Sequence, residues 1–111
     1  MSADVPPSFH VEVSPEGSIL LRGELDMATI QALQNKIDEI LVPGRPIVLD
    51  LAQLTFLDSS AVHCFIKTEA QSGHPVLLMN ASRTVRRLLD LMTQPEPQAW
   101  IFNGEGPPSA P

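Results

Sequence analysis

Hydrophobic and polar positions change their period several times along the chain, and each change marks an expected element. The stretches "SFHVEVS" and "GSILLRG" predict two short strands around a turn at "PEG", with Phe9, Val11 and Val13 on one face of the first strand. Next, "DMATIQALQNKIDEIL" has apolar residues at three- and four-residue spacing, which predicts a helix with one buried stripe. We expect Asp26 to cap the first turn of this helix. The stripe consists of Ile30, Leu33, Ile37, Ile40 and Leu41.

The middle of the chain combines an almost wholly apolar stretch with a polar corner. "IVLDLA" predicts a central strand that is covered on both faces, because nearly all of its residues are apolar. "LTFLDSS" reads as a corner after that strand, and a second helix follows it and ends near Gly73. The residues expected on the inner side of this helix are Val62, Phe65, Ile66 and Ala70.

The last third predicts one more strand and helix, and then an edge strand. "PVLLMN" is typical of a buried strand, and "SRTVRRLLDLM" predicts a helix that Ser82 caps, while "AWIF" predicts a final edge strand. The order β-β-α-β-α-β-α-(β) indicates an α/β fold with a mixed, mostly parallel β-sheet, about three helices and right-handed crossovers. The inner side of the third helix is predicted to hold Val85, Leu88, Leu89 and Met92.

Length and charge restrict the class of protein. The 111 residues, of which 43% are hydrophobic, suit a single domain, expected over residues 9–103, with flexible tails at 1–8 and 104–111. The formal net charge of −6 argues against direct nucleic-acid binding, which needs clustered Lys and Arg. No apolar run is long enough for a membrane span, and the first residues do not resemble a secretory signal. Together with a single cysteine, Cys64, this pattern predicts a soluble cytoplasmic protein.

The corner Asp58-Ser59-Ser60 has one carboxylate and two hydroxyl groups in three consecutive residues. Its simplest interpretation is a helix cap, because Asp and Ser accept hydrogen bonds from the unpaired N–H groups of a first turn. One such residue is enough for a cap, however, and the corner has three. A helix N-terminus also tolerates a phosphate group, and a phosphoserine would add about 1.5 to 2 negative charges beside Asp58. The corner therefore fits either a cap or a phosphorylation switch.

Two motifs resemble the STAS domains, named for sulfate transporters and anti-sigma factor antagonists, and in particular the stand-alone bacterial antagonists. The motifs are "GELD" within "LRGELDMATIQAL" and "DLxxLxFLDSS" within "IVLDLAQLTFLDSSAV", and "VLLMNASRTVRRLLDLM" extends the likeness. The resemblance implies an antagonist that binds an anti-sigma factor, a serine kinase of the GHKL type, in its unphosphorylated state and thereby frees a sigma factor. The kinase then phosphorylates the antagonist, which dissociates, and a PP2C-type phosphatase resets it.

Carried over residue by residue, the resemblance assigns the phosphoacceptor to Ser59. It places Asp58 and Asp26 at the motif acids near that serine, and Ser60 at a Ser/Thr position that is not the usual acceptor. The chain departs from the family pattern where Ala61 and His63 stand in place of two glycines. Glycines let another backbone approach closely, so this departure bears on how a kinase docks.

His63 follows Ser59 by four residues, which puts both side chains on one face of a helix. The simplest interpretation of His63 is a partly exposed helix histidine. The functional hypothesis is that protonated His63 stabilises phospho-Ser59, and an NMR titration of His63 that is unchanged by phosphorylation would contradict it. A Ser–His hydrolase is disfavoured because the chain lacks a Gly-x-Ser-x-Gly elbow. Cys64 is interpreted as a small core residue rather than a redox sensor. The scattered histidines indicate no metal site, and no cofactor is expected.

Two functions from different classes follow. The first is a non-enzymatic anti-sigma factor antagonist that is switched off by phosphorylation at Ser59. The alternative is a STAS adaptor that is not phosphorylated, as a subunit of a signalling scaffold or a lipid-transport complex, in which the Asp58-Ser59-Ser60 corner serves as cap and docking surface. The substituted glycines keep the alternative open. The sequence does not determine the oligomeric state.

Overall fold

The computed structural model describes residues 9–93 and the backbone of residues 101–103, and these form a sheet with three helices. The strands are β1 (Phe9–Val13), β2 (Ile19–Leu25), β3 (Val48–Leu57), β4 (Leu77–Met79) and β5 (Ile101–Asn103). The helices are α1 (Ile30–Ile40), α2 (Ser59–Ser72) and α3 (Arg83–Met92). The predicted element order is confirmed, including β5 as an edge strand, while Ala99, Trp100 and the predicted tails lie outside the described residues.

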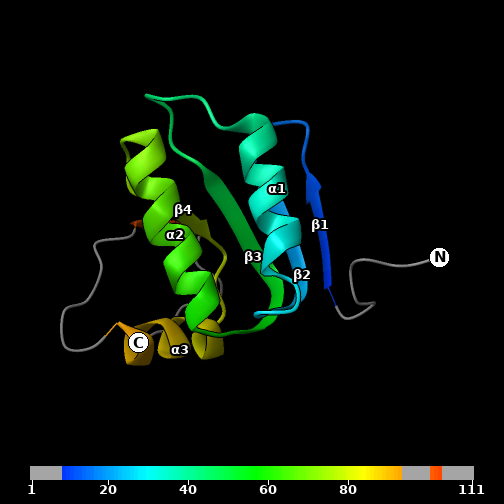
Figure 1. Ribbon diagram of the computed structural model, residues 1–111. Helices are drawn as coiled ribbons and strands as arrows, with labels where there is room; N and C mark the ends of the chain where they lie inside the picture. The colour runs from blue at the N-terminus through cyan, green and yellow to red at the C-terminus, as the bar shows by residue number, and fades with distance from the viewer. Residues whose placement is uncertain (1–8, 94–100, 104–111) are drawn as a thin grey trace.

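The five strands follow one another across the sheet in the order β1-β2-β3-β4-β5. Only β1 runs antiparallel to its neighbour, and β2 to β5 are parallel. Each parallel connection contains one helix, and right-handed crossovers between strands that advance in one direction place their helices on the same side of the sheet. Figure 1 shows α1 and α2 side by side against the sheet, with α3 across the end at which α2 begins.

This topology corrects one prediction about β3. The strand is central, but it is not covered on both faces: Ala52 and Gln53 are exposed, as are Arg22 of β2 and His10 of β1. The physical reason is the strand order, which places none of the helices of residues 9–93 on the second face of the sheet. Its apolar residues are only partly buried there, for example Val48.

The strand β3 is also longer than predicted, because "LTFL" belongs to it rather than to a corner. Its buried residues are spaced by two and then three positions, at Leu49, Leu51, Leu54 and Leu57. Two register shifts against β2 produce this pattern, since β3 has an extra residue between Asp50 and Gln53 and another at Thr55. Such bulges move the side-chain alternation by one residue, so the apolar period no longer looks like a strand.

Gly23 lies opposite the second bulge and has a φ of +99°, a backbone conformation that glycine adopts without a steric penalty. The glycine of "GELD" therefore has a structural role in the sheet.

The helix stripes are confirmed with two exceptions. In α2, Val62 and Phe65 are buried as predicted, but Ile66 and Ala70 are exposed. Cys64, Thr68 and Ser72 take up the inner side instead, because α2 faces both the sheet and α1. The other two stripes are buried or partly buried, and the predicted cap of α3 is confirmed, since Ser82 Oγ accepts a hydrogen bond from Val85 N–H at 3.1 Å.

Candidate functional site

The Asp58-Ser59-Ser60 corner lies where β3 ends and α2 begins at once. Asp58 is the N-cap residue of α2, and its Oδ1 accepts hydrogen bonds from Ser60 N–H at 2.9 Å and from the Ser60 hydroxyl at 2.5 Å. The cap interpretation is therefore correct for Asp58 and Ser60, which together satisfy one of the orphan donors of the first turn. The Ser60 hydroxyl is already engaged and half-buried.

Ser59 differs from both of its neighbours. Its side chain is exposed, and within the described part of the chain its hydroxyl takes part in no hydrogen bond. As the first residue of α2 it stands at the positive end of the helix dipole, where added negative charge is stabilised. The corner thus presents one accessible hydroxyl in an environment that tolerates a phosphate group.

Asp26 lies at the equivalent end of the neighbouring strand. Leu25 and Leu57 are register partners in β2 and β3, and Asp58 N–H donates to the Leu25 carbonyl oxygen at 3.1 Å. The two motif acids, Asp26 and Asp58, therefore follow directly after paired residues. The structure brings together the two motifs that the sequence separates by about thirty residues, as expected when the carboxyl ends of parallel strands meet at one edge.

The predicted role of Asp26 needs a correction. Helix α1 begins at Ile30 with Thr29 as its N-cap, and Asp26 lies before the helix in a turn of its own. Its carboxylate accepts the N–H groups of Ala28 at 2.9 Å and Thr29 at 3.2 Å, so it closes that turn rather than capping α1. In turns, an Asp side chain often accepts hydrogen bonds from backbone N–H groups two or three residues ahead of it.

The two glycine replacements have different structural consequences. Ala61 is fully buried in the core, so its methyl group adds nothing to the surface. His63 is exposed one helical turn after Ser59, so this replacement does change the exposed face of α2. Within residues 9–93, no hydrogen bond joins Ser59 to His63.

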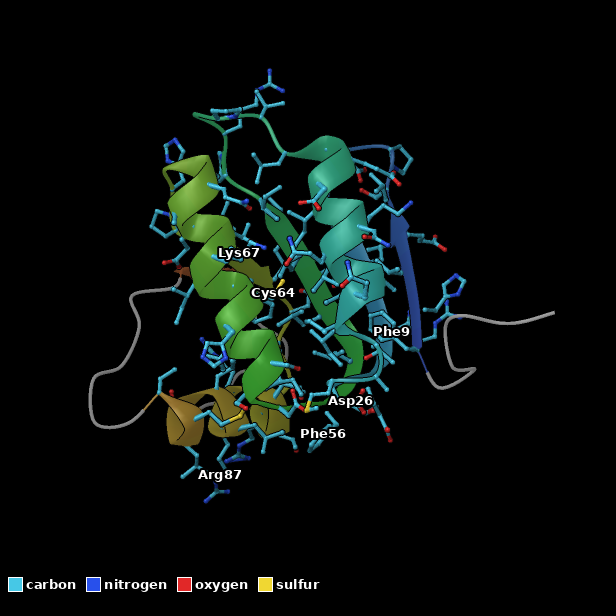
Figure 2. All side chains as sticks on the ribbon, in the orientation of Figure 1. Phe9, Asp26, Phe56, Cys64, Lys67 and Arg87 are labelled. Atoms are coloured by element: carbon cyan, nitrogen blue, oxygen red, sulfur yellow. The ribbon has the colours of Figure 1, made fainter. Side chains whose placement is uncertain are left out.

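Two exposed apolar residues beside the acids escaped the sequence interpretation. Met27 directly follows Asp26 and is 80% exposed, and Phe56, two residues before Asp58, is 41% exposed. Figure 2 shows Phe56 and Asp26 at the same end of the molecule. The second bulge turns Phe56 away from the core, and that bulge is not visible in the sequence. The sequence does indicate that Met27 is exposed, because this residue lies outside the apolar stripe of α1.

Cys64 lies between α1 and α2 (Figure 2), buried as a core residue, and its thiol donates to Gln34 Oε1 at 3.4 Å. Burial raises the pKa of the Cys64 thiol, and this outweighs the hydrogen bond with Thr68 and the nearby charge of Lys67, which lower it. The thiol is therefore protonated at neutral pH, which is typical of a structural cysteine.

Among the described residues, no group of three or more His, Cys, Asp or Glu side chains is arranged to hold a metal ion. In the same part of the chain, every helix is too short or too polar to cross a membrane.

The fold and the two paired motifs define a class of protein, and comparison with known families agrees with them. The family model of the STAS domain matches residues 11–104, and the chain belongs to this family. The match includes both motif acids and the whole Asp58-Ser59-Ser60 corner.

Among solved structures, the chain is similar to the anti-sigma factor antagonist SpoIIAA in its unphosphorylated form. The TM-score is 0.58 and the sequence identity is 25%, over 75% of this chain and 78% of that one.

Proposed function

We propose that this chain is an anti-sigma factor antagonist that binds an anti-sigma factor kinase while Ser59 is unphosphorylated and is released when Ser59 carries a phosphate. The observation that supports the proposal most strongly is that the three residues of the corner differ in their hydrogen bonds. Asp58 and Ser60 complete the cap, while the Ser59 hydroxyl is exposed and unused within residues 9–93. A cap alone does not require that hydroxyl.

The position of Ser59 also suits a switch that leaves the fold intact. A phosphate there lies at the N-terminus of α2, where the helix dipole favours an anion. It adds about 1.5 to 2 negative charges at an end of the sheet that already has Asp26 and Asp58. A docked partner then meets like charge or a reorganised contact, whereas the core of the antagonist is unaffected.

The surroundings of Ser59 fit a protein interface. Met27 and Phe56 are exposed apolar residues at the same end, and apolar side chains beside polar groups are typical of docking surfaces. The kinase of the GHKL type and the PP2C-type phosphatase are the partners that the family resemblance implies. The similar structure of an antagonist described as unphosphorylated supports the same class of function.

The test compares substitutions at Ser59 as baits in native lysate, with retained proteins identified by mass spectrometry and then purified for affinity measurement. We expect wild type and Ser59→Ala to retain an anti-sigma kinase, and Ser59→Glu to bind it about 100-fold more weakly through charge repulsion. Ser59→Gln is the matched control, since it has the size of glutamate without the charge, and it should bind more tightly than Ser59→Glu. Incubation with the kinase and ATP should place phosphate on Ser59 alone.

The adaptor alternative rests on the same corner. Asp58 and Ser60 form a complete cap, and His63 stands where a glycine would let a kinase approach. If Ser59→Glu and wild type retain the same partners with equal affinity, the switch is wrong and the adaptor function is favoured.

A further inference from the structure

The outward side of α3 concentrates positive charge on an acidic protein. The chain has a net charge of −6 with only 7 Lys and Arg residues, yet Arg83, Arg86 and Arg87 lie within five positions of α3. The open surface along this side of the helix is lined by Arg83, Thr84, Arg86, Arg87, Leu88, Asp90 and Leu91, so it has three arginines and one aspartate. This surface therefore differs in sign from the overall charge of the molecule.

Helical spacing arranges three of these side chains in one row. Arg83, Arg87 and Leu91 are separated by four residues each, so they lie above one another on the helix. Val85 and Leu89 lie on the opposite side and are buried in the core. Leu91 is 65% exposed, which leaves a large apolar side chain in water at the end of a cationic row. We call Arg83, Arg87 and Leu91 the arginine row.

The stability of α3 does not explain the arginine row. Cations near the N-terminus of a helix oppose its dipole, and acids in that turn stabilise it. α3 has Arg83 as its first residue, no acid in its first turn and no basic residue in its last turn. Among the described residues, neither Arg83 nor Arg87 is engaged in an ion pair. Arg83 is thus placed where it weakens the helix slightly, which favours a role in binding.

The arginine row lies at the same end of the molecule as Ser59. α3 contacts both α2 and β3, the two elements that meet at the Asp58-Ser59-Ser60 corner. Figure 1 shows α3 across the end of the sheet where α2 begins, and in Figure 2 Arg87 points away from the sheet into solvent. A partner that covers Ser59 is therefore close enough to reach α3.

From this placement we infer that the arginine row docks an acidic segment of the anti-sigma kinase, with carboxylates facing Arg83 and Arg87 and an apolar side chain against Leu91. This inference rests on the proposed function and deepens it. Opposite charges at an interface accelerate association and select the partner. A phosphate on Ser59 places its negative charge at the end of the molecule that the acidic segment approaches, so attraction turns towards repulsion in the phosphorylated state.

The test uses the full chain and, as the probe, the purified kinase that the Ser59 experiment identifies. The variant is Arg83→Glu/Arg87→Glu, and the matched control is Arg45→Glu/Lys67→Glu, which makes the same change in net charge at two exposed positions away from α3. We expect the α3 variant to bind about 30-fold more weakly and the control to stay within about threefold of wild type. Leu91→Ser should weaken binding about fivefold through lost apolar contact.

Two further readouts separate docking from folding. Raising the salt concentration should weaken wild-type binding steeply and affect the α3 variant much less, because exposed charges are screened. The melting temperature of the α3 variant should equal or exceed that of wild type, since glutamate in the first turn suits the helix dipole.

The outcomes distinguish the inference from the proposed function. If wild type binds the kinase, Ser59→Glu releases it, and the α3 variant has the same affinity as the control, the inferred role of the arginine row is wrong. The switch at Ser59 is then still supported. If no anti-sigma kinase binds wild type, both are wrong. If the α3 substitutions abolish binding to phosphatidylserine vesicles or to a DNA duplex while kinase affinity is unchanged, the row serves a different partner and the inference is overturned.

Discussion

The two corners at which α1 and α2 follow their strands begin alike and end differently. Both open with Leu-Asp, as "LDMAT" at residues 25–29 and "LDSS" at residues 57–60, and the two leucines are register partners in β2 and β3. In the first corner Thr29 is only 2% exposed, and its hydroxyl donates to the Glu24 carbonyl oxygen at 2.8 Å and accepts from Asp26 N–H at 2.9 Å. In the second corner, the Ser59 hydroxyl is exposed and takes part in no hydrogen bond within residues 9–93.

The difference follows from where each helix begins. α2 starts directly after Asp58, so Ser59 occupies the first helical position and points outward, while Ser60 turns back to the aspartate. α1 starts only after a turn over residues 27–29, and that turn folds Thr29 back beneath the end of β2. A hydroxyl near a helix start is thus structural in one corner and available for chemistry in the other.

The sharpest test of this contrast is stability. Thr29→Val removes the buried hydroxyl and leaves the Asp26 N–H and the Glu24 carbonyl without that partner, which should cost about 2 kcal/mol of unfolding free energy. Ser59→Ala should change it by less than about 0.5 kcal/mol, because the residue is exposed and its hydroxyl is unused within the described structure. Urea denaturation of both variants measures the difference. Equal losses would show that Ser59 has a structural role after all.

A smaller effect is expected from the two aspartates. Asp58→Ala removes the acceptor of the Ser60 N–H group and should cost about 1 kcal/mol, whereas Asp58→Asn should restore most of the loss because amide oxygens also cap helices. Asp26→Ala removes the acceptor of two backbone N–H groups in the turn and should cost a similar amount. Thermal denaturation monitored by circular dichroism is the measurement. A loss at Asp58 that Asn does not restore would indicate that its charge, not its cap, stabilises the corner.

The smallest effect on stability is expected for Cys64. Its thiol donates a hydrogen bond from α2 to Gln34 of α1, and these are the helices that begin at the two corners. The pKa of this thiol is raised in the folded state by burial, so the unfolded chain loses the thiol proton first as pH rises. The stabilisation from the neutral thiol is therefore fully present below the unfolded-state pKa and is lost as pH rises from there through the folded-state pKa. The stability difference between wild type and Cys64→Ala should shrink between pH 7 and pH 10 in urea denaturation. A difference that grows with pH would contradict the burial of a neutral thiol.

Much of the architecture could be predicted from local pattern, and the misses have a common cause. Helix stripes with a regular period, such as Leu33 and Ile37 in α1, are buried as expected, because one helix face must meet the core whatever lies beyond it. Ile66 was predicted inside and is exposed, since the direction that α2 faces depends on its contact with α1. The exposure of Phe56 could not be predicted from the local pattern, because a bulge that depends on pairing with β2 turns this side chain outward.

The sequence by itself determined the element order, the family motifs and the acid–serine corner, because these depend on residue types at short range. Tertiary structure alone decided that the three crossover helices pack on the same side of the sheet, and that Asp26 lies beside Asp58. It also decided which hydroxyl is used, with Ser60 bonded to Asp58 and Ser59 left exposed. The physical reason is that strand pairing and packing join residues far apart in the chain, and no local pattern encodes which partners they meet.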